Sequence, residues 1–112
     1  MPGMQKRSFD APDATLPLGD KASGERVTVS GVNVKRATFE PGWHWTEHVA
    51  DDLCSTRHAG YVASGRLHVV MEDGHATEIG PGDAVVIEPG HDAWTVGDEA
   101  CVFIDFGESV SG

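Results

Sequence analysis

Apolar and polar residues alternate in short runs along most of the chain, beginning at Val27. Val27 and Val29 precede a break at Ser30-Gly31, and residues 32–39 contain further stretches with a period of two. Side chains that alternate in this way point to opposite faces of a β-strand, and β-branched residues favour strands. The pattern therefore predicts two paired, half-buried strands in this region.

Five further apolar runs follow, and turn residues separate each run from the next. They are residues 61–63, 67–71, 84–87, 94–96 and 100–106. The intervening Asp73-Gly74, Pro89-Gly90 and Gly97-Asp98 pairs are typical of turns, because Gly and Asp tolerate positive φ and Pro withdraws a backbone donor. No apolar period of 3.6 residues persists for the roughly ten residues that a helix needs. The sequence predicts an all-β fold.

The 112 residues suffice for one domain with a single core. Residues 1–24 mix Pro, Gly and charged residues without a sustained period, so we expect an irregular N-terminal arm there. Its apolar Phe9, Leu16 and Leu18 are expected to lie across the barrel surface or a partner subunit. Residues 25–107 are predicted to form the β-barrel, and residues 108–112 a fraying tail.

The formal net charge of −10 argues against partners that are themselves polyanions. Such a surface repels nucleic-acid phosphates and anionic lipid heads, so we expect no nucleic-acid or membrane partner. No run approaches the roughly 20 apolar residues that span a bilayer, and no apolar signal core follows the first residues. These features predict a cytoplasmic protein, in which Cys54 and Cys101 would remain thiols.

Candidate metal ligands gather in two stretches of the chain. Residues 41–65 contain His48, Cys54 and His58, and residues 80–94 add His91. Imidazole and thiolate are the ligands that zinc prefers in proteins. We therefore expect the two stretches to fold against each other and to bring His and Cys side chains together inside the barrel.

The turn spacing around these stretches resembles that of the cupins, a family of small jelly-roll barrels also described as double-stranded β-helices. Residues 82–90, which read Gly-Asp-Ala-Val-Val-Ile-Glu-Pro-Gly, resemble the family's second motif, and residues 58–65 resemble the close of its first. The resemblance covers roughly residues 25–106. It implies a cupin fold, and it implies a homodimer.

The ligand positions differ from the family's usual arrangement of three His and one Glu. His58 stands where the family has its Glu, Cys54 and Asp52 stand at the two His positions, and Ala93 occupies the last His position, with His91 two residues earlier. An extended chain would separate Cys54 from His58 by about 13 Å, so both can bind one ion only if the chain bends between them.

A rearranged site remains compatible with these residues. If Cys54, His58 and His91 converge, with His48 as a further candidate, the thiolate favours zinc. If Cys54 stays outside and His48 joins the other two histidines, iron or nickel becomes competitive. The simpler alternatives are a hydrogen-bonded core histidine for His58 and a buried cysteine without chemistry for Cys54.

Aromatic and acidic residues near these stretches suggest a binding pocket. Its expected members are Trp43, Trp45, Tyr61 and Trp94 at the barrel mouth, with Asp92 as a carboxylate that clamps the His91 imidazole. Packing in the core or at a subunit contact is the competing interpretation of the aromatic residues.

Three functions are compatible with these features. The first is a metal-dependent enzyme acting on a small organic molecule, with Glu47 or Asp52 moving protons. The second is a non-catalytic module that binds or senses a small ligand, and the third is a metal-free structural domain. The fold alone does not choose among them.

Overall fold

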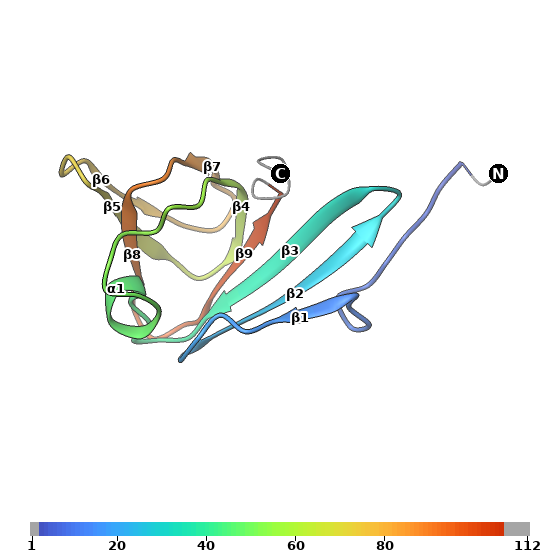
Figure 1. Ribbon diagram of the computed structural model, residues 1–112, viewed down its shortest axis with the longest axis horizontal. Helices are drawn as coiled ribbons and strands as arrows, with labels where there is room; N and C mark the ends of the chain where they lie inside the picture. Colours follow the sequence, from blue (N-terminus) through green and yellow to red (C-terminus); the bar gives the residue numbers. More distant parts are fainter. Residues whose placement is uncertain (1–2, 107–112) are drawn as a thin grey trace.

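The computed structural model describes residues 3–106, which form two antiparallel β-sheets (Figure 1). The larger sheet has the strand order β1-β2-β3-β9-β4-β7, and the smaller has the order β6-β5-β8. The larger sheet consists of β1 (Ala14–Leu16), β2 (Ala22–Val29), β3 (Val32–Phe39), β4 (His58–Ser64), β7 (Ala84–Ile87) and β9 (Cys101–Asp105). The smaller sheet consists of β5 (Leu67–Met71), β6 (Ala76–Ile79) and β8 (His91–Thr95). The predicted tail at residues 108–112 lies outside the described residues.

The hydrophobic core lies between the two sheets and follows the predicted alternation. On β8 the alternate residues His91, Ala93 and Thr95 are buried, whereas Asp92 and Trp94 between them are partly exposed. The buried core cluster comprises Trp43, Val62, Leu67, Val69, Ile79, Ala93, Cys101 and Phe103. The predicted all-β jelly-roll fold is therefore confirmed.

Gly60 allows β4 to approach β9 more closely than any side chain would permit. A Cβ atom built at Gly60 would lie 1.8 Å from the carbonyl oxygen of Ile104. The strands pair so that Gly60 is opposite Asp105, which brings the start of β4 against the end of β9. This contact positions His58, two residues before Gly60, beside Asp105.

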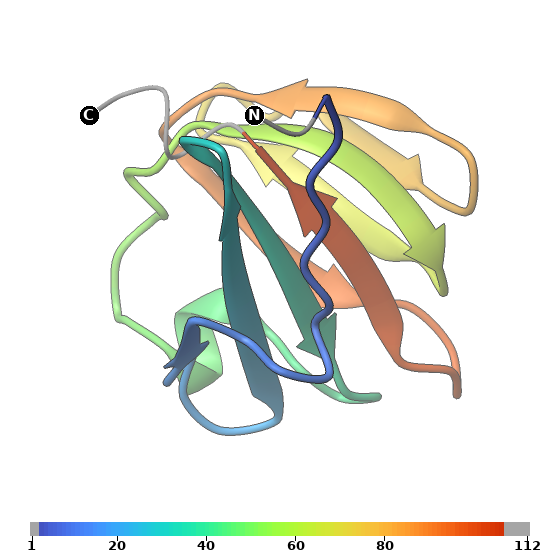
Figure 2. The ribbon, with the colours of Figure 1, turned by 90° about the vertical axis from the view of Figure 1, so that its right-hand side faces the viewer.

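The N-terminal arm is more regular than the sequence predicted. Its β1 pairs with β2. The Leu18 side chain packs over Gly24, since a Cβ atom built at Gly24 would lie 3.0 Å from Leu18 Cδ1. Figure 2 shows the first described residues, from residue 3 on, running across the six-stranded sheet, where the Arg36 guanidinium lies 4.9 Å from the centre of the Phe9 ring. The period-two signal failed here because β1 is only three residues long, too short to show an alternation.

Two further elements escaped the sequence pattern. The helix α1 (Trp45–His48) is a single turn, far below the length at which a helical period becomes visible. The strand β6 was missed because three of its four residues are exposed and it has little apolar alternation. Within residues 3–106, no helix is both long enough and apolar enough to span a membrane.

Candidate metal centre

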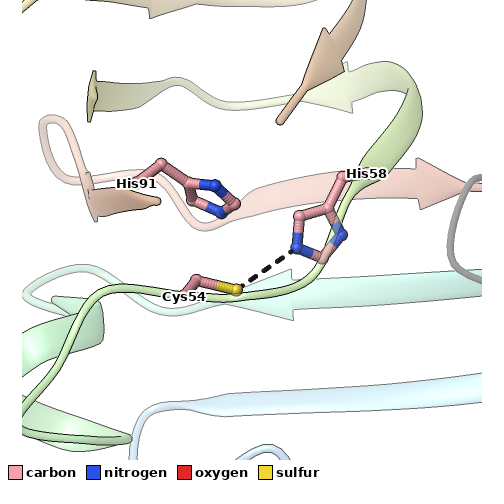
Figure 3. Close-up of side chains that lie close together, drawn as sticks. All are labelled: Cys54, His58 and His91. Carbon is pink, nitrogen blue, oxygen red and sulfur yellow. Dashed lines mark hydrogen bonds between the residues drawn. The ribbon is translucent and has the colours of Figure 1, made fainter. Parts of the chain in front are cut away.

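Three of the four predicted ligands meet in one place. Cys54, His58 and His91 each offer a ligand atom, and these atoms lie within 4.8 Å of one another. Figure 3 shows the thiol and the two imidazoles pointing toward a common centre. His58 belongs to the six-stranded sheet and His91 to the three-stranded sheet, so the cluster spans both halves of the fold.

Backbone hydrogen bonds hold Cys54 beside His91. The Cys54 amide donates to the His91 carbonyl at 2.8 Å, and the Gly90 amide donates to the Cys54 carbonyl at 2.7 Å. The strand β4 begins only at His58, so residues 55–57 can bend. The Cys54 Sγ consequently lies 3.7 Å from His58 Nε2, which the extended geometry would have forbidden.

Each imidazole is oriented by a hydrogen bond on its far side. His91 Nδ1 lies 2.7 Å from the Glu88 carbonyl, which can only accept, so Nδ1 donates and Nε2 is the nitrogen that can bind an ion. His58 Nδ1 lies 2.6 Å from Asp105 Oδ2. Metal-bound histidines commonly donate a hydrogen bond from their second ring N–H in this way.

Asp105 is a site residue that the sequence analysis missed. It is 6% exposed and ends the apolar strand β9. A carboxylate at the end of so apolar a strand is rarely buried without a partner, and this position in the sequence is the signal that could have revealed it. The sequence does not show which histidine it faces, because that depends on the β4–β9 register.

The environment shifts the pKa values of Cys54 and His58 in opposite directions. Burial alone would raise the pKa of the Cys54 thiol, but hydrogen bonds with His58 and His91 lower it from 9.0 to about 6. Burial alone would lower the pKa of His58, but hydrogen bonds with Asp105 and Cys54 raise it from 6.5 to about 9. Without metal, the two groups therefore form a thiolate–imidazolium pair near neutral pH.

His48 does not join the three converging ligands. Its Nδ1 accepts a hydrogen bond of 3.1 Å from the His44 amide across the single turn of α1. The side chain lines the cavity described below, but the geometry groups only Cys54, His58 and His91 within the described residues.

The four predicted aromatic residues separate into two groups. Trp43 and Trp45 line the cavity. Tyr61 is 43% exposed, because the alternation along β4 buries Val62 and turns its neighbour outward. Trp94 also faces outward from β8, where it stacks on His68 with ring centroids 4.7 Å apart.

Asp92 clamps a different histidine from the one predicted. Its Oδ2 lies 2.8 Å from Nε2 of His44. Burial alone would raise the pKa of Asp92, but the hydrogen bond with His44 and the other hydrogen bonds to this carboxylate together outweigh it, and the pKa is lowered. Adjacent residues on a strand point to opposite faces, so Asp92 cannot reach the His91 ring.

The two acidic residues expected to move protons also lie elsewhere. Glu47 pairs with Nδ1 of His44 at 3.0 Å, and the exposed Asp52 carboxylate accepts from the Leu53 amide at 2.8 Å.

A cavity of about 680 Å³ extends from the three ligands along the inner face of the six-stranded sheet. Much of its wall is apolar and includes Phe39, Leu67 and Phe103. Two N–H groups in the wall, Arg26 Nε and Trp43 Nε1, are buried and have no hydrogen-bond partner among the described residues. The cavity is large enough for a small organic molecule.

The fold and the buried His/Cys cluster together define a jelly-roll barrel with an internal polar centre. The profile of the Cupin domain family matches residues 35–107. The chain therefore belongs to the cupin family, as the turn spacing of its two motifs predicted. No curated protein matches the sequence.

Solved structures with the same fold are distant in sequence. The polyketide cyclase RemF from Streptomyces resistomycificus is 18% identical over 91% of this chain and 77% of its own, with a TM-score of 0.63. A variant of Bacillus subtilis oxalate decarboxylase is 19% identical over 93% of this chain but 29% of its own, with a TM-score of 0.62. KdgF from Halomonas sp. is 18% identical over 83% of this chain and 86% of its own, with a TM-score of 0.56.

The three ligands suit a divalent metal ion. One thiolate and two imidazoles match the donor types of zinc sites, and three protein ligands leave a coordination position for water or substrate. Both imidazoles have the outer hydrogen bond that such sites use to fix the ring. The three side chains thus fit a metal ion, although they differ from the three His and one Glu that are usual in the family.

Proposed function

We propose that this protein is a metal-binding cupin that takes a small organic molecule in its barrel. Cys54, His58 and His91 would hold a divalent ion, with zinc favoured over iron or nickel because one ligand is a thiolate. The convergence of these three side chains from both sheets carries the proposal.

The surrounding residues have definable roles around such an ion. Asp105 and the Glu88 carbonyl orient the two imidazoles, and the apolar wall of the cavity keeps bulk water from the bound molecule. A bound ion would polarise an oxygen of that molecule or lower the pKa of a bound water. Cys54 and His58 would give up the proton that they otherwise share.

Elemental analysis of protein prepared without a purification tag tests the proposal. The expected result is one metal ion per chain, dominated by zinc when all three metals are supplied. Protein that binds no metal under these conditions would contradict it. Turnover of an identified ligand would then distinguish an enzyme from a module that binds or senses the ligand.

A second candidate function is thiol chemistry without a metal. The Cys54 Sγ, the His58 imidazole and the Asp105 carboxylate form one hydrogen-bonded series, which is the arrangement of nucleophile, base and orienting acid in hydrolases. Alkylation of Cys54 separates the two candidates. A metal site predicts protection of Cys54 by stoichiometric zinc, whereas the thiol mechanism predicts that Cys54 reacts equally fast with and without zinc.

The proposal includes a homodimer. The outer face of β4 and β7 carries the exposed apolar side chains Tyr61 and Val86, which a second copy could cover. Sedimentation of the 11.9 kDa chain should give twice that mass, and a monomer at micromolar concentration would contradict this part.

A further inference from the structure

Two hydrogen-bond donors of residues that line the cavity have no acceptor among the described residues. The two buried, unpartnered atoms found in it are Arg26 Nε and Trp43 Nε1. Guanidinium and indole N–H groups can donate but cannot accept. A buried donor without a partner is destabilising, so the natural occupant of the cavity should supply acceptor atoms.

Arg26 lies in the same transverse row of the sheet as the residue that orients His58. The strand register pairs Arg26 with Lys35 and Lys35 with Asp105, and all three side chains line the cavity. With neighbouring strands about 4.8 Å apart, the Arg26 backbone lies roughly 10 Å from that of Asp105. A small molecule can therefore reach from Arg26 to the three converging ligands.

The charges around Arg26 favour an anionic partner. A guanidinium group is cationic and offers its N–H donors in a planar fork that matches a carboxylate. Glu25, its neighbour on β2, faces the other side of the sheet and pairs with Arg36 at 2.9 Å. Asp105, on the cavity side, has its Oδ2 bound to His58. Neither of these two carboxylates accepts a hydrogen bond from Arg26 Nε.

We propose that Arg26 forms a carboxylate-binding subsite, so that the ligand of this protein is a small organic acid. Its carboxylate accepts from Arg26, its apolar body lies along the cavity wall near Ala37 and Phe103, and its other end faces Cys54, His58 and His91. The inference rests on the proposed function, because it assigns the ligand class for the same cavity. Guanidinium–carboxylate hydrogen bonds are among the strongest in proteins, since both partners are charged.

A matched pair of probes tests the subsite. 3-Phenylpropanoate and its primary amide, 3-phenylpropanamide, have the same shape, but only the acid is charged. Calorimetric titration of the zinc-loaded full chain should give a dissociation constant about tenfold or more lower for the acid. The variant Arg26→Gln should lose this preference. The control Arg66→Gln changes an exposed arginine that pairs with Glu78 outside the cavity and should keep it.

Three results would overturn the subsite: no saturable binding of the acid, equal affinity for both probes, or an unchanged preference in Arg26→Gln. If that variant does not fold, the Arg26 Nε–H signal of the ¹⁵N-labelled wild type decides the question. The acid should shift this signal and the amide should leave it in place, and a signal unmoved by the acid overturns the inference.

The same titration on metal-free protein distinguishes failure of the subsite from failure of the proposed metal centre. A wild type that binds no zinc but prefers the acid would contradict the metal centre and support the subsite. A wild type that binds one zinc without preferring the acid would support the metal centre and overturn the subsite.

Discussion

The protein contains two histidine–aspartate pairs of similar geometry in different surroundings. His58 and Asp105 lie 2.6 Å apart on the cavity wall, and His44 and Asp92 lie 2.8 Å apart on the outside of the smaller sheet. The two histidine side chains are almost equally exposed, at 27% and 25%. Burial of the imidazole therefore does not explain why only the first pair belongs to a candidate metal site.

The difference lies in what each second ring nitrogen faces. Both nitrogens of His44 have carboxylate partners, Asp92 on Nε2 and Glu47 on Nδ1. His58 binds its carboxylate through Nδ1 alone, and its Nε2 faces Cys54 with His91 nearby. An imidazole binds a metal ion through a ring nitrogen that has no proton and no hydrogen-bond partner in the way. A thiolate beside that nitrogen provides a second ligand for the same ion. The comparison teaches that the partner of the second ring nitrogen, more than the aspartate, defines the site.

The largest expected contrast between the two pairs is in zinc affinity, when the histidine of each pair is replaced in turn. His58→Ala should weaken zinc binding by more than about 100-fold, because it removes a ligand from a site of three. His44→Ala should leave zinc affinity within about twofold, since that ring lies outside the cluster. Competition titration with a chelating dye measures both variants. Equal losses in the two would remove the distinction drawn between the pairs.

The carboxylates should show a smaller contrast in the same assay. Asp105→Asn leaves the ligands in place but weakens the hydrogen bond that orients His58, and a loss of about 10- to 100-fold in zinc affinity is expected. Asp92→Asn is the matched control and should bind zinc like the wild type. An Asp105→Asn protein with wild-type affinity would show that His58 needs no orienting carboxylate.

The two cysteines allow a test of the cavity environment in metal-free protein. The pKa of Cys54 is lowered to about 6, whereas burial, with Glu99 nearby, raises the pKa of Cys101 to about 12. Ultraviolet absorbance of the thiolate should therefore rise for one cysteine as the pH increases through about 6. Cys54→Ser should abolish this step. A step that persists in Cys54→Ser, or first appears above pH 8, would contradict the thiolate–imidazolium pair.

The smallest expected effect is the stability contributed by the outer pair. Because the folded-state pKa of Asp92 is lowered, its contribution is present above the unfolded-state pKa and is lost as pH falls through the folded-state pKa. Asp92→Asn should lower the free energy of unfolding by about 1 kcal/mol at pH 7. Urea titrations at pH 7 and at about pH 3 should show the difference from wild type shrinking under acid. A difference that grows under acid would contradict this sign.

The sequence predicted the fold better than it predicted the site. Alternation and turn residues located most of the strands because burial of one face imposes a period of two along each strand. In the structure, the same parity puts His91 and Ala93 together on the inner face of β8. The convergence of Cys54 with His91 depends on backbone hydrogen bonds between distant segments, and Asp105 depends on the register of β4 with β9. Neither long-range pairing leaves a local pattern in the chain.

The pocket prediction was wrong for two of its four aromatic residues, since Trp43 and Trp45 line the cavity and the other two do not. Tyr61 and Trp94 were grouped with Trp43 and Trp45 by their type and their position near the motifs. The alternation that locates a strand also decides which face each residue occupies, and it turns Tyr61 and Trp94 away from the cavity. Applied residue by residue, parity would have separated them.

Cobalt substitution tests the central claim most directly, because a cobalt–thiolate bond gives an absorption band that imidazole ligands alone do not produce. Wild-type protein titrated with Co²⁺ should develop this band and saturate at one ion per chain, and zinc should abolish it. Cys54→Ser should show no band. Saturation of the wild type without the thiolate band, or an unchanged band in Cys54→Ser, would contradict a metal centre formed by Cys54, His58 and His91.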